Sequence, residues 1–173
     1  MVTLRCTQVV RKRLGLAPNL PAPPSPTTAL GDWYVHLLRL GRQQIVMATS
    51  EGSLLTVLLP ARELRASLAP NLRLAVRNLL MALDVPSHAV QREIAAMEPV
   101  ALAKAVNKRV IGSINEFAYQ LFAYVGQTSD PLELALRLSD TPMSAIGAKS
   151  TYGIPMNVAR ELLEASGDGR ASN

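Results

Sequence analysis

The chain contains few side chains of the types that catalyse reactions or bind metals. It has two histidines, His36 and His88, and one cysteine, Cys6. The histidines show neither HxH nor HxxxH spacing, whereas a zinc site needs three or four cysteine, histidine or carboxylate ligands. We therefore expect no metal, no cofactor and no identifiable catalytic residue. His36 lies among apolar residues of a predicted strand, so we expect it to be packed or exposed at an edge.

The familiar phosphate-chemistry motifs are also missing. The Gly-Ser pair at 112–113 is reminiscent of a nucleotidyltransferase turn, but that chemistry needs an Asp-x-Asp pair to hold two magnesium ions. The sequence supplies only SDPLE downstream, whose acids mark a helix start. No GxxxxGK[ST], GxGxxG or GxSxG motif occurs in the sequence. The motifs of the sequence therefore predict no particular catalysed reaction.

The strongest candidate for anion binding is the segment 107–117, NKRVIGSINEF. If a helix begins at Asn107, its first turn carries two cations that oppose the helix dipole, at about 0.3–1 kcal/mol each. An anion would offset that cost, because free backbone N–H groups and the dipole attract negative charge to a helix N-terminus. The candidate ligands of such an anion are Lys108, Arg109, Ser113 and Asn115.

A second register of the same helix needs no ligand. Ser113 and Glu116 fit an S-x-x-E capping box, which would leave Lys108 and Arg109 in a solvated turn before the helix. Both registers remain open. The apolar stripe that runs unbroken through Val110 favours a start nearer Asn107 than Ser113.

Basic residues suggest a nucleic-acid face. The chain has a net charge of +5 and a pI near 9.8, and its first 31 residues contain four basic residues and no acid. If a strand at 100–105 pairs with the strand at 2–6, six cations could share one surface. They are Arg11, Lys12, Arg13, Lys104, Lys108 and Arg109. A structural alternative needs no nucleic acid: the basic residues at 11–13 lie in the last turn of their own helix, where cations favourably oppose the negative end of the helix dipole.

Composition indicates an ordinary globular protein of 173 residues. Hydrophobic residues make up 49% of the chain, charged residues 18%, and the mean hydropathy is +0.16. The strongest apolar run, LLTVLL, is far shorter than the roughly 20 residues of a membrane helix. No signal-peptide order is present, and one cysteine cannot form an internal disulfide, so we expect a cytoplasmic protein with no membrane partner.

The elements that must position these residues form an α+β pattern. Alternation predicts a strand at 2–6, and Thr7 and Gly15 would cap a short helix between them. A stiff loop with five prolines between 18 and 26 follows. Three strands are then expected at 32–40, 43–49 and 54–59, joined by turns at 41–42 and 50–53 into consecutive antiparallel hairpins. We expect LLTVLL to be central and covered on both faces, and Trp33 to be a buried sheet anchor rather than a base-stacking platform.

Helices dominate after Pro60. They are expected at 61–67, 71–83, 87–97, around Phe117, 130–138 and 155–165, with 99–105 as a fifth strand. Asn71 is a possible cap, and Asp130 with Glu133 predicts a capping box. The expected architecture is a small, mainly antiparallel sheet of four or five strands packed with helices from the C-terminal half. It would form a single domain over 1–165 with a disordered tail at 166–173.

Three stretches together resemble an uncharacterised family of small bacterial proteins, a domain-of-unknown-function family. They are VTLRCTQVVRKRL, the GDWY stretch within 30–64, and NKRVIGSINEF. The family carries similar TLRCT, GDWY and GS(M/I)N(D/E)F stretches, and the resemblance spans roughly residues 2–125. This chain departs from it at Lys108-Arg109, where the family has arginine followed by serine, and at Ile114 in place of methionine. The resemblance implies a bacterial origin and a toxin–antitoxin or defence-associated locus, and it implies no activity.

Two functional hypotheses follow. The first is a non-enzymatic module that binds nucleic acid or an acidic protein partner through the basic residues. The second is an enzyme of unrecognised type with a polar, anion-binding pocket near Ser113 and Asn115. The lack of a His/Cys/carboxylate constellation favours the first.

Overall fold

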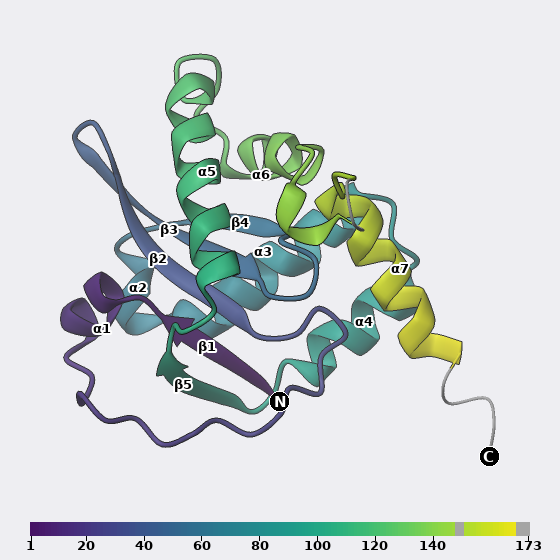
Figure 1. The fold of residues 1–173 in the computed structure, drawn as a ribbon, viewed down its shortest axis with the longest axis horizontal. Helices are drawn as coiled ribbons and strands as arrows, with labels where there is room; N and C mark the ends of the chain where they lie inside the picture. Colours follow the sequence, from purple (N-terminus) through teal and green to yellow (C-terminus); the bar gives the residue numbers. More distant parts are fainter. Residues whose placement is uncertain (148–150, 169–173) are drawn as a thin grey trace.

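The computed structural model describes residues 1–147 and 151–168, and it alternates a few strands with many helices (Figure 1). Five strands form one sheet, and helices pack on both of its faces. In chain order the described elements are β1 (Val2–Cys6), α1 (Gln8–Leu14), β2 (Trp33–Leu40), β3 (Gln43–Ser50), β4 (Thr56–Pro60), α2 (Glu63–Ala66), α3 (Leu68–Ala82), α4 (Ser87–Ala96), β5 (Val100–Lys104), α5 (Lys108–Tyr124), α6 (Pro131–Ser139), the 3₁₀ turn η1 (Ser144–Ile146) and α7 (Pro155–Asp168).

The sheet is mixed and has the order β4-β3-β2-β1-β5. Strands β2, β3 and β4 are consecutive and antiparallel, as the sequence predicted, and β2 pairs with β3 along its whole length, from Trp33↔Ser50 to Leu40↔Gln43. The tight turn of this long hairpin places Gly41 at φ 59°, a conformation that favours glycine. Strand β1 instead pairs in parallel with both β2 and β5.

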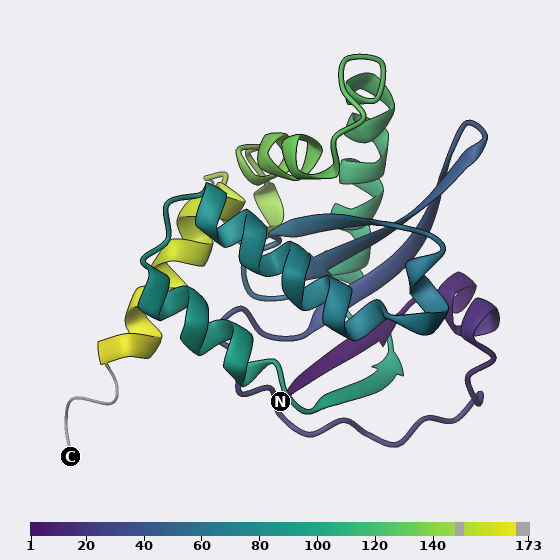
Figure 2. The ribbon, with the colours of Figure 1, turned by 180° about the vertical axis from the view of Figure 1, so that it is seen from behind.

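Two hydrophobic layers account for the burial of the sheet. Helices α3, α4 and α7 lie on one side, where Leu4, Trp33 and Val35 belong to the larger core (Figure 2). Helix α5 lies on the other side, where Tyr34, Met47 and Phe117 belong to a second core (Figure 1). Helix α6 lies beside the edge strand β4 and contributes to both cores. The alternation of Trp33, Tyr34 and Val35 between the two cores follows from the two-residue period of a strand. The class is therefore α+β, as predicted.

Strand β4 differs from its prediction. It begins at Thr56 rather than Leu54, and it is an edge strand rather than a central one. Its residues from Thr56 to Leu59 are nevertheless buried, because Val57 and Leu59 belong to the larger core, Leu58 belongs to the second core, and α3 and α6 both pack against β4. A nearly continuous apolar strand thus signals two covered faces, and it does not signal two neighbouring strands.

Several predicted caps can be checked against the helix ends. Gly15 ends α1 in the left-handed region, at φ 67°, as predicted. Asp130 caps α6 by accepting a hydrogen bond from the Leu132 N–H at 3.1 Å. The predicted partner in its capping box, Glu133, instead forms an ion pair with Arg137 at 2.8 Å, which its position one helical turn earlier favours.

Three other predicted helix ends were wrong or shifted. Asn71 is not a cap, because α3 already begins at Leu68, and the Asn71 side chain donates to Ser67 Oγ within the first turn. Thr7 occupies the cap position of α1 but makes no capping hydrogen bond. Helix α7 runs on to Asp168, so the first three residues of the predicted tail are helical, while 169–173 lie outside the described residues.

Candidate functional site

A buried ion pair ties β1 to the residue that precedes β2. Arg5 Nε donates to Asp32 Oδ2 at 2.8 Å, and Asp32 Oδ1 accepts the Thr3 N–H at 3.0 Å. Asp32 is only 1% exposed. Because a buried carboxylate is costly without partners, the two donors explain how an acid can sit there.

The same set of contacts extends to the start of α5. Glu51 Oε1 accepts from Asn107 Nδ2 at 2.9 Å and from the Tyr34 hydroxyl at 3.4 Å, and the Asn107 N–H donates to the Tyr34 oxygen at 3.2 Å. Arg5 Nε lies 4.0 Å from Glu51 Oε2 and so joins the two halves. Burial is the main cause that raises the pKa of Tyr34, which stays protonated as a donor. We call Arg5, Asp32, Tyr34, Glu51 and Asn107 the Asp32–Asn107 network.

This network decides the register of α5. Asn107 Oδ1 accepts the Arg109 N–H at 3.0 Å and caps the helix, so α5 begins at Lys108, as the apolar stripe predicted. The alternative capping box at Ser113 is wrong. Ser113 lies inside α5, is 2% exposed, and its hydroxyl donates to the Arg109 carbonyl at 3.1 Å.

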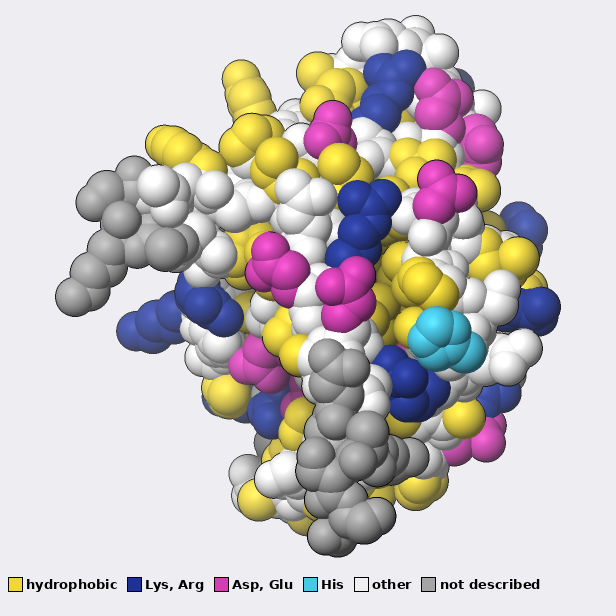
Figure 3. All heavy atoms as spheres, turned by 90° about the vertical axis from the view of Figure 1, so that its right-hand side faces the viewer, with side chains coloured by type: hydrophobic (Ala, Val, Ile, Leu, Met, Phe, Trp, Pro, Cys, Tyr) yellow, Lys and Arg dark blue, Asp and Glu magenta, His cyan; other side chains and the backbone are white. Residues whose placement is uncertain are grey.

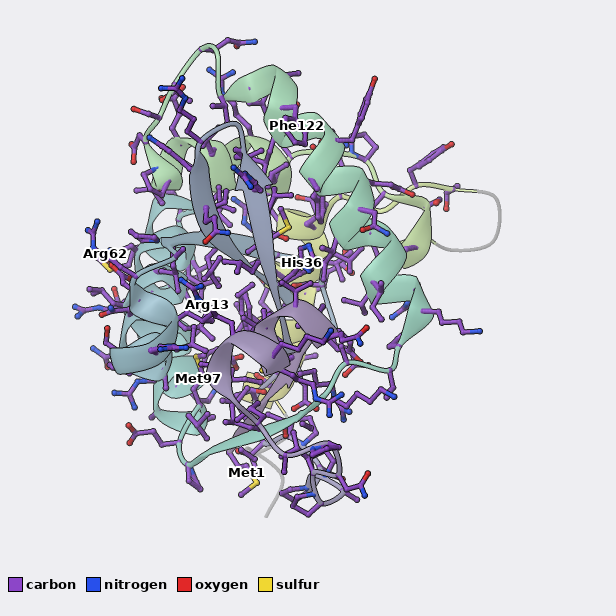
Figure 4. All side chains as sticks on the ribbon, turned by 90° about the vertical axis from the view of Figure 1, so that its left-hand side faces the viewer. Met1, Arg13, His36, Arg62, Met97 and Phe122 are labelled. Carbon is purple, nitrogen blue, oxygen red and sulfur yellow. The ribbon has the colours of Figure 1, made fainter. Side chains whose placement is uncertain are left out.

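A cavity of about 490 Å³ opens between α1 and the first half of α5. We call it the α1–α5 cavity. Helix α1 and the residue before it, strand β2, the end of β5 and helix α5 all contribute to its walls, and His36 lies on the sheet between the two helices (Figure 4). The lining residues are Thr7, Gln8, Val9, Arg11, His36, Lys104, Ala105, Ile111, Ile114 and Asn115. None of these lining residues is acidic.

Polar groups of the cavity differ in how fully they are bonded. Thr7 Oγ1 and His36 Nδ1 share a hydrogen bond of 3.1 Å, and burial lowers the pKa of His36, which favours the neutral imidazole. Arg11 Nη2 donates to the Pro18 carbonyl at 2.6 Å, whereas its buried Nε has no acceptor among the described residues. The side chains of Lys104 and Asn115 form no hydrogen bond or ion pair within residues 1–147 and 151–168.

Three of the residues that the sequence singled out for anion binding therefore meet in one cavity, namely Arg11, Lys104 and Asn115. The parallel pairing of β1 with β5 brings them together, because it sets Cys6 opposite Lys104 just before α1 begins. The structure thus meets the condition on which the shared surface depended, that the strand near 100–105 pairs with the strand at 2–6.

The other singled-out residues lie outside the cavity lining. Lys12 and Arg13 are exposed on the last turns of α1. Lys108 and Arg109 are exposed on the first turn of α5, and Arg109 Nη1 donates to the Ala145 carbonyl at 3.0 Å. Ser113, being buried and bonded to its own helix, does not line the cavity.

Sequence reasoning missed two features of this region. One is the Thr7–His36 pair, which exists because β1 and β2 run parallel with Cys6 opposite Val35. The other is the contact of α2, a helix that the sequence did predict, with the end of α1: Arg65 donates to the Arg13 carbonyl at 3.0 and 3.1 Å. A local pattern could have revealed neither contact, because both join segments that are far apart in the sequence.

The remaining reactive side chains are internal. Trp33 is fully buried in the larger core, which confirms its prediction as a sheet anchor. Cys6 is also fully buried, and burial raises the pKa of its thiol to about 11, so the thiol stays protonated and unreactive near neutral pH.

Among the described residues, no group of three or more histidine, cysteine, aspartate or glutamate side chains is placed to hold a metal ion. No described helix is both long and apolar enough to cross a membrane.

Comparison of the sequence with known protein families assigns the chain to one of them. A family model described as "Domain of unknown function (DUF6933)" matches residues 3–158. The chain belongs to the DUF6933 family. No curated protein and no solved structure matches it.

The DUF6933 match extends from β1 into α7 and thus includes both the network and the cavity. It also includes, except for Val2, the three stretches on which the sequence resemblance rested. In the structure these stretches contact one another directly, through Arg5 with Asp32, Tyr34 with Asn107, and Thr7 with His36. Segments that are separated by up to about a hundred residues therefore build one corner of the molecule.

Proposed function

We propose that the protein binds nucleic acid through a basic surface centred on the α1–α5 cavity. We define this basic surface by six residues on α1, the end of β5 and the first turn of α5. They are Arg11, Lys12, Arg13, Lys104, Lys108 and Arg109. The observation that carries the proposal is the cavity itself, where Arg11 and Lys104 meet with no acidic lining residue.

The chemistry of the cavity suits a sugar–phosphate chain. Cations bind phosphate oxygens, while neutral amide and hydroxyl groups, here Gln8, Asn115 and Thr7, can bond phosphate or sugar oxygens beside them. Acidic side chains are absent from α1 as well as from the cavity lining. On the opposite side of the molecule, where α4 and α7 lie, acidic and basic side chains are interspersed instead (Figure 3).

Salt dependence tests this proposal. Binding of labelled single-stranded RNA and duplex DNA should weaken steeply between low and moderate salt, because each neutralised phosphate releases counterions. The double variant Lys12→Ala/Lys104→Ala should weaken binding and reduce the salt slope by about one per lost phosphate contact. Arg77→Ala is the matched control, since Arg77 is an exposed arginine of α3, outside the basic surface. Absence of binding at low salt, or binding that salt does not affect, would show the proposal to be wrong.

We also propose the biological setting that the resemblance implies, a cytoplasmic bacterial protein in a toxin–antitoxin or defence-associated locus. Neighbouring genes test this point separately. A co-transcribed small toxin or antitoxin gene would support it, and neighbours of unrelated metabolic function would count against it.

One observation favours an enzyme as a second candidate. Thr7 and His36 form a hydroxyl–imidazole pair in the cavity wall, and a neutral imidazole in the same cavity as two cations can accept a proton from a bound ligand. If this candidate is correct, labelled RNA should be cleaved by the wild type and left intact by His36→Ala, while both bind it. Intact RNA in both samples would leave simple binding as the function.

A further inference from the structure

A second cavity, larger than the first, lies between the β2–β3 hairpin and the corner where α5 leads into α6. Its volume is about 640 Å³, within the range of ligand-binding pockets. We call it the hairpin cleft. It contains none of the six residues of the basic surface. Its lining residues are Arg39, Leu40, Arg42, Gln43, Gln44, Ile45, Leu58, Leu59, Pro60, Ala61, Arg62, Val125, Ser129, Pro131 and Leu134.

The charges of the hairpin cleft all have one sign. It is lined by three arginines, Arg39 and Arg42 from the hairpin and Arg62 from the start of α2, and by no acidic residue. Arg39 Nε donates to the Gly41 carbonyl at 3.2 Å, which leaves the rest of its guanidinium free. Arg42 and Arg62 are exposed and form no hydrogen bond or ion pair with any described residue.

Between the arginines the cleft is aliphatic. Ile45, Leu58 and Leu134 are among its lining residues, and Val125 of the α5 end is 40% exposed at its wall. Phe122, one turn earlier on α5 and outside the cleft lining, is 57% exposed (Figure 4). Large apolar side chains that cluster beside unpaired cations mark a surface for a partner with both kinds of group.

We propose that the hairpin cleft docks an acidic, amphipathic segment of a partner protein. An apolar side chain of the partner would fill the aliphatic floor, and carboxylates beside it would bond Arg42 and Arg62. Arginine is suited to this contact, because its planar guanidinium can bond a carboxylate in two places. A buried apolar anchor surrounded by such pairs is the usual arrangement of strong interface residues.

Nucleic acid fits this cleft less well than it fits the basic surface. Nine of the fifteen residues that line the hairpin cleft are apolar, against four of the ten that line the α1–α5 cavity. The arginines of the cleft can bond phosphate or carboxylate, but its larger apolar floor is better matched by the apolar side chain of a protein segment than by a sugar–phosphate chain. The two cavities therefore suit two different partners.

Designed peptides can test the proposal on the intact protein. The probe is a short fluorescein-labelled peptide in which leucines at i, i+4 spacing are flanked by glutamates. One control peptide replaces each leucine with serine and keeps the charge, and a second replaces each glutamate with glutamine and keeps the leucines. Fluorescence anisotropy should show that only the leucine–glutamate peptide binds well, since the cleft offers both an apolar floor and arginines.

Protein variants locate the binding. Arg42→Ala/Arg62→Ala should weaken the peptide about tenfold or more, which corresponds to about 1.4 kcal/mol, and Val125→Asp should weaken it as well. Arg77→Ala should leave it unchanged. Both cleft variants alter exposed side chains, so their melting temperatures should match that of the wild type.

Three results would overturn the proposal. They are no binding of the leucine–glutamate peptide, equal binding of the serine peptide, and equal binding by wild type and Arg42→Ala/Arg62→Ala. Competition by RNA that depends on Arg42 and Arg62 would instead assign the cleft to nucleic acid. None of these results bears on Lys12 and Lys104, so the two proposals can fail separately.

Discussion

The Asp32–Asn107 network and the basic surface occupy the same corner of the molecule but use charge in opposite ways. In the network, Arg5 forms ion pairs with Asp32 and Glu51, and Glu51 also accepts a hydrogen bond from Asn107. On the basic surface, the side chains of Lys12, Lys104 and Lys108 form no ion pair or hydrogen bond with any described residue. A buried charge must be paired within the fold, whereas an exposed cation costs little and stays available to a ligand. Whether a charged side chain has an ion-pair or hydrogen-bond partner within the fold therefore distinguishes structural residues from candidate binding residues, and the number of charges does not.

The network should therefore respond to mutation as structure. Asp32→Ala leaves the Thr3 N–H and the Arg5 guanidinium without their acceptor in a buried position. We expect the free energy of unfolding to fall by about 3–5 kcal/mol, the usual cost of removing one member of a buried pair. Urea denaturation at neutral pH measures this change. It is the largest effect that we predict.

Asp130→Ala provides the matched control for Asp32→Ala. Asp130 also accepts a backbone N–H, but it is exposed, and a lost cap costs about 1 kcal/mol. If the two variants lose the same free energy of unfolding, the network does not hold the fold together and the comparison above fails.

Much of the fold could be predicted from local patterns. The turn glycine at 41 and the apolar periodicity on either side specified the β2–β3 hairpin, and the apolar stripe through Val110 specified the start of α5. The edge position of β4 could not be predicted in this way. The apolar composition of a strand predicts that its two faces are buried, but it does not predict whether the strand is central or at an edge. Part of the burial of β4 comes from α6, which follows more than seventy residues later in the sequence.

The candidate site was less predictable than the fold. The sequence indicated Arg11, Lys104 and Asn115 by residue type, and their convergence depended on a strand pairing that was only a conditional expectation. The Thr7–His36 contact needed, in addition, the parallel register of β1 and β2. Ser113 shows the converse error, because a hydroxyl that suits a ligand can equally well bond a carbonyl one turn back in its own helix.

His36, which lines the α1–α5 cavity, should make the free energy of unfolding depend on pH. Burial lowers the pKa of His36 from its ordinary value of 6.5, so the unfolded chain binds this proton more tightly than the folded protein. The free energy of unfolding should be fully retained above pH 6.5 and should fall as the pH drops below it towards the lowered pKa. Denaturation at several pH values should show this loss in the wild type and a smaller loss in His36→Asn.

A bound polyanion should change that behaviour. Phosphates in the α1–α5 cavity favour the protonated imidazole, so RNA should bind more tightly as the pH falls, and His36→Asn should abolish this trend. His88→Asn is the control, because His88 is exposed on α4 and does not line the cavity. If His88→Asn removes the pH dependence and His36→Asn does not, the titrating group lies outside the cavity.

The smallest effect is expected at the start of α5. Lys108→Ala/Arg109→Ala removes two cations that oppose the helix dipole, a gain of about 0.3–1 kcal/mol each, and loses the exposed bond from Arg109 to the Ala145 carbonyl. Without ligand these terms nearly cancel, so thermal unfolding should show an unchanged or slightly raised Tm. Added phosphate or RNA should raise the Tm of the wild type and of Arg77→Ala by mass action, but not that of the double variant. A Tm several degrees lower without ligand would instead place Lys108 and Arg109 with the structural residues of the network.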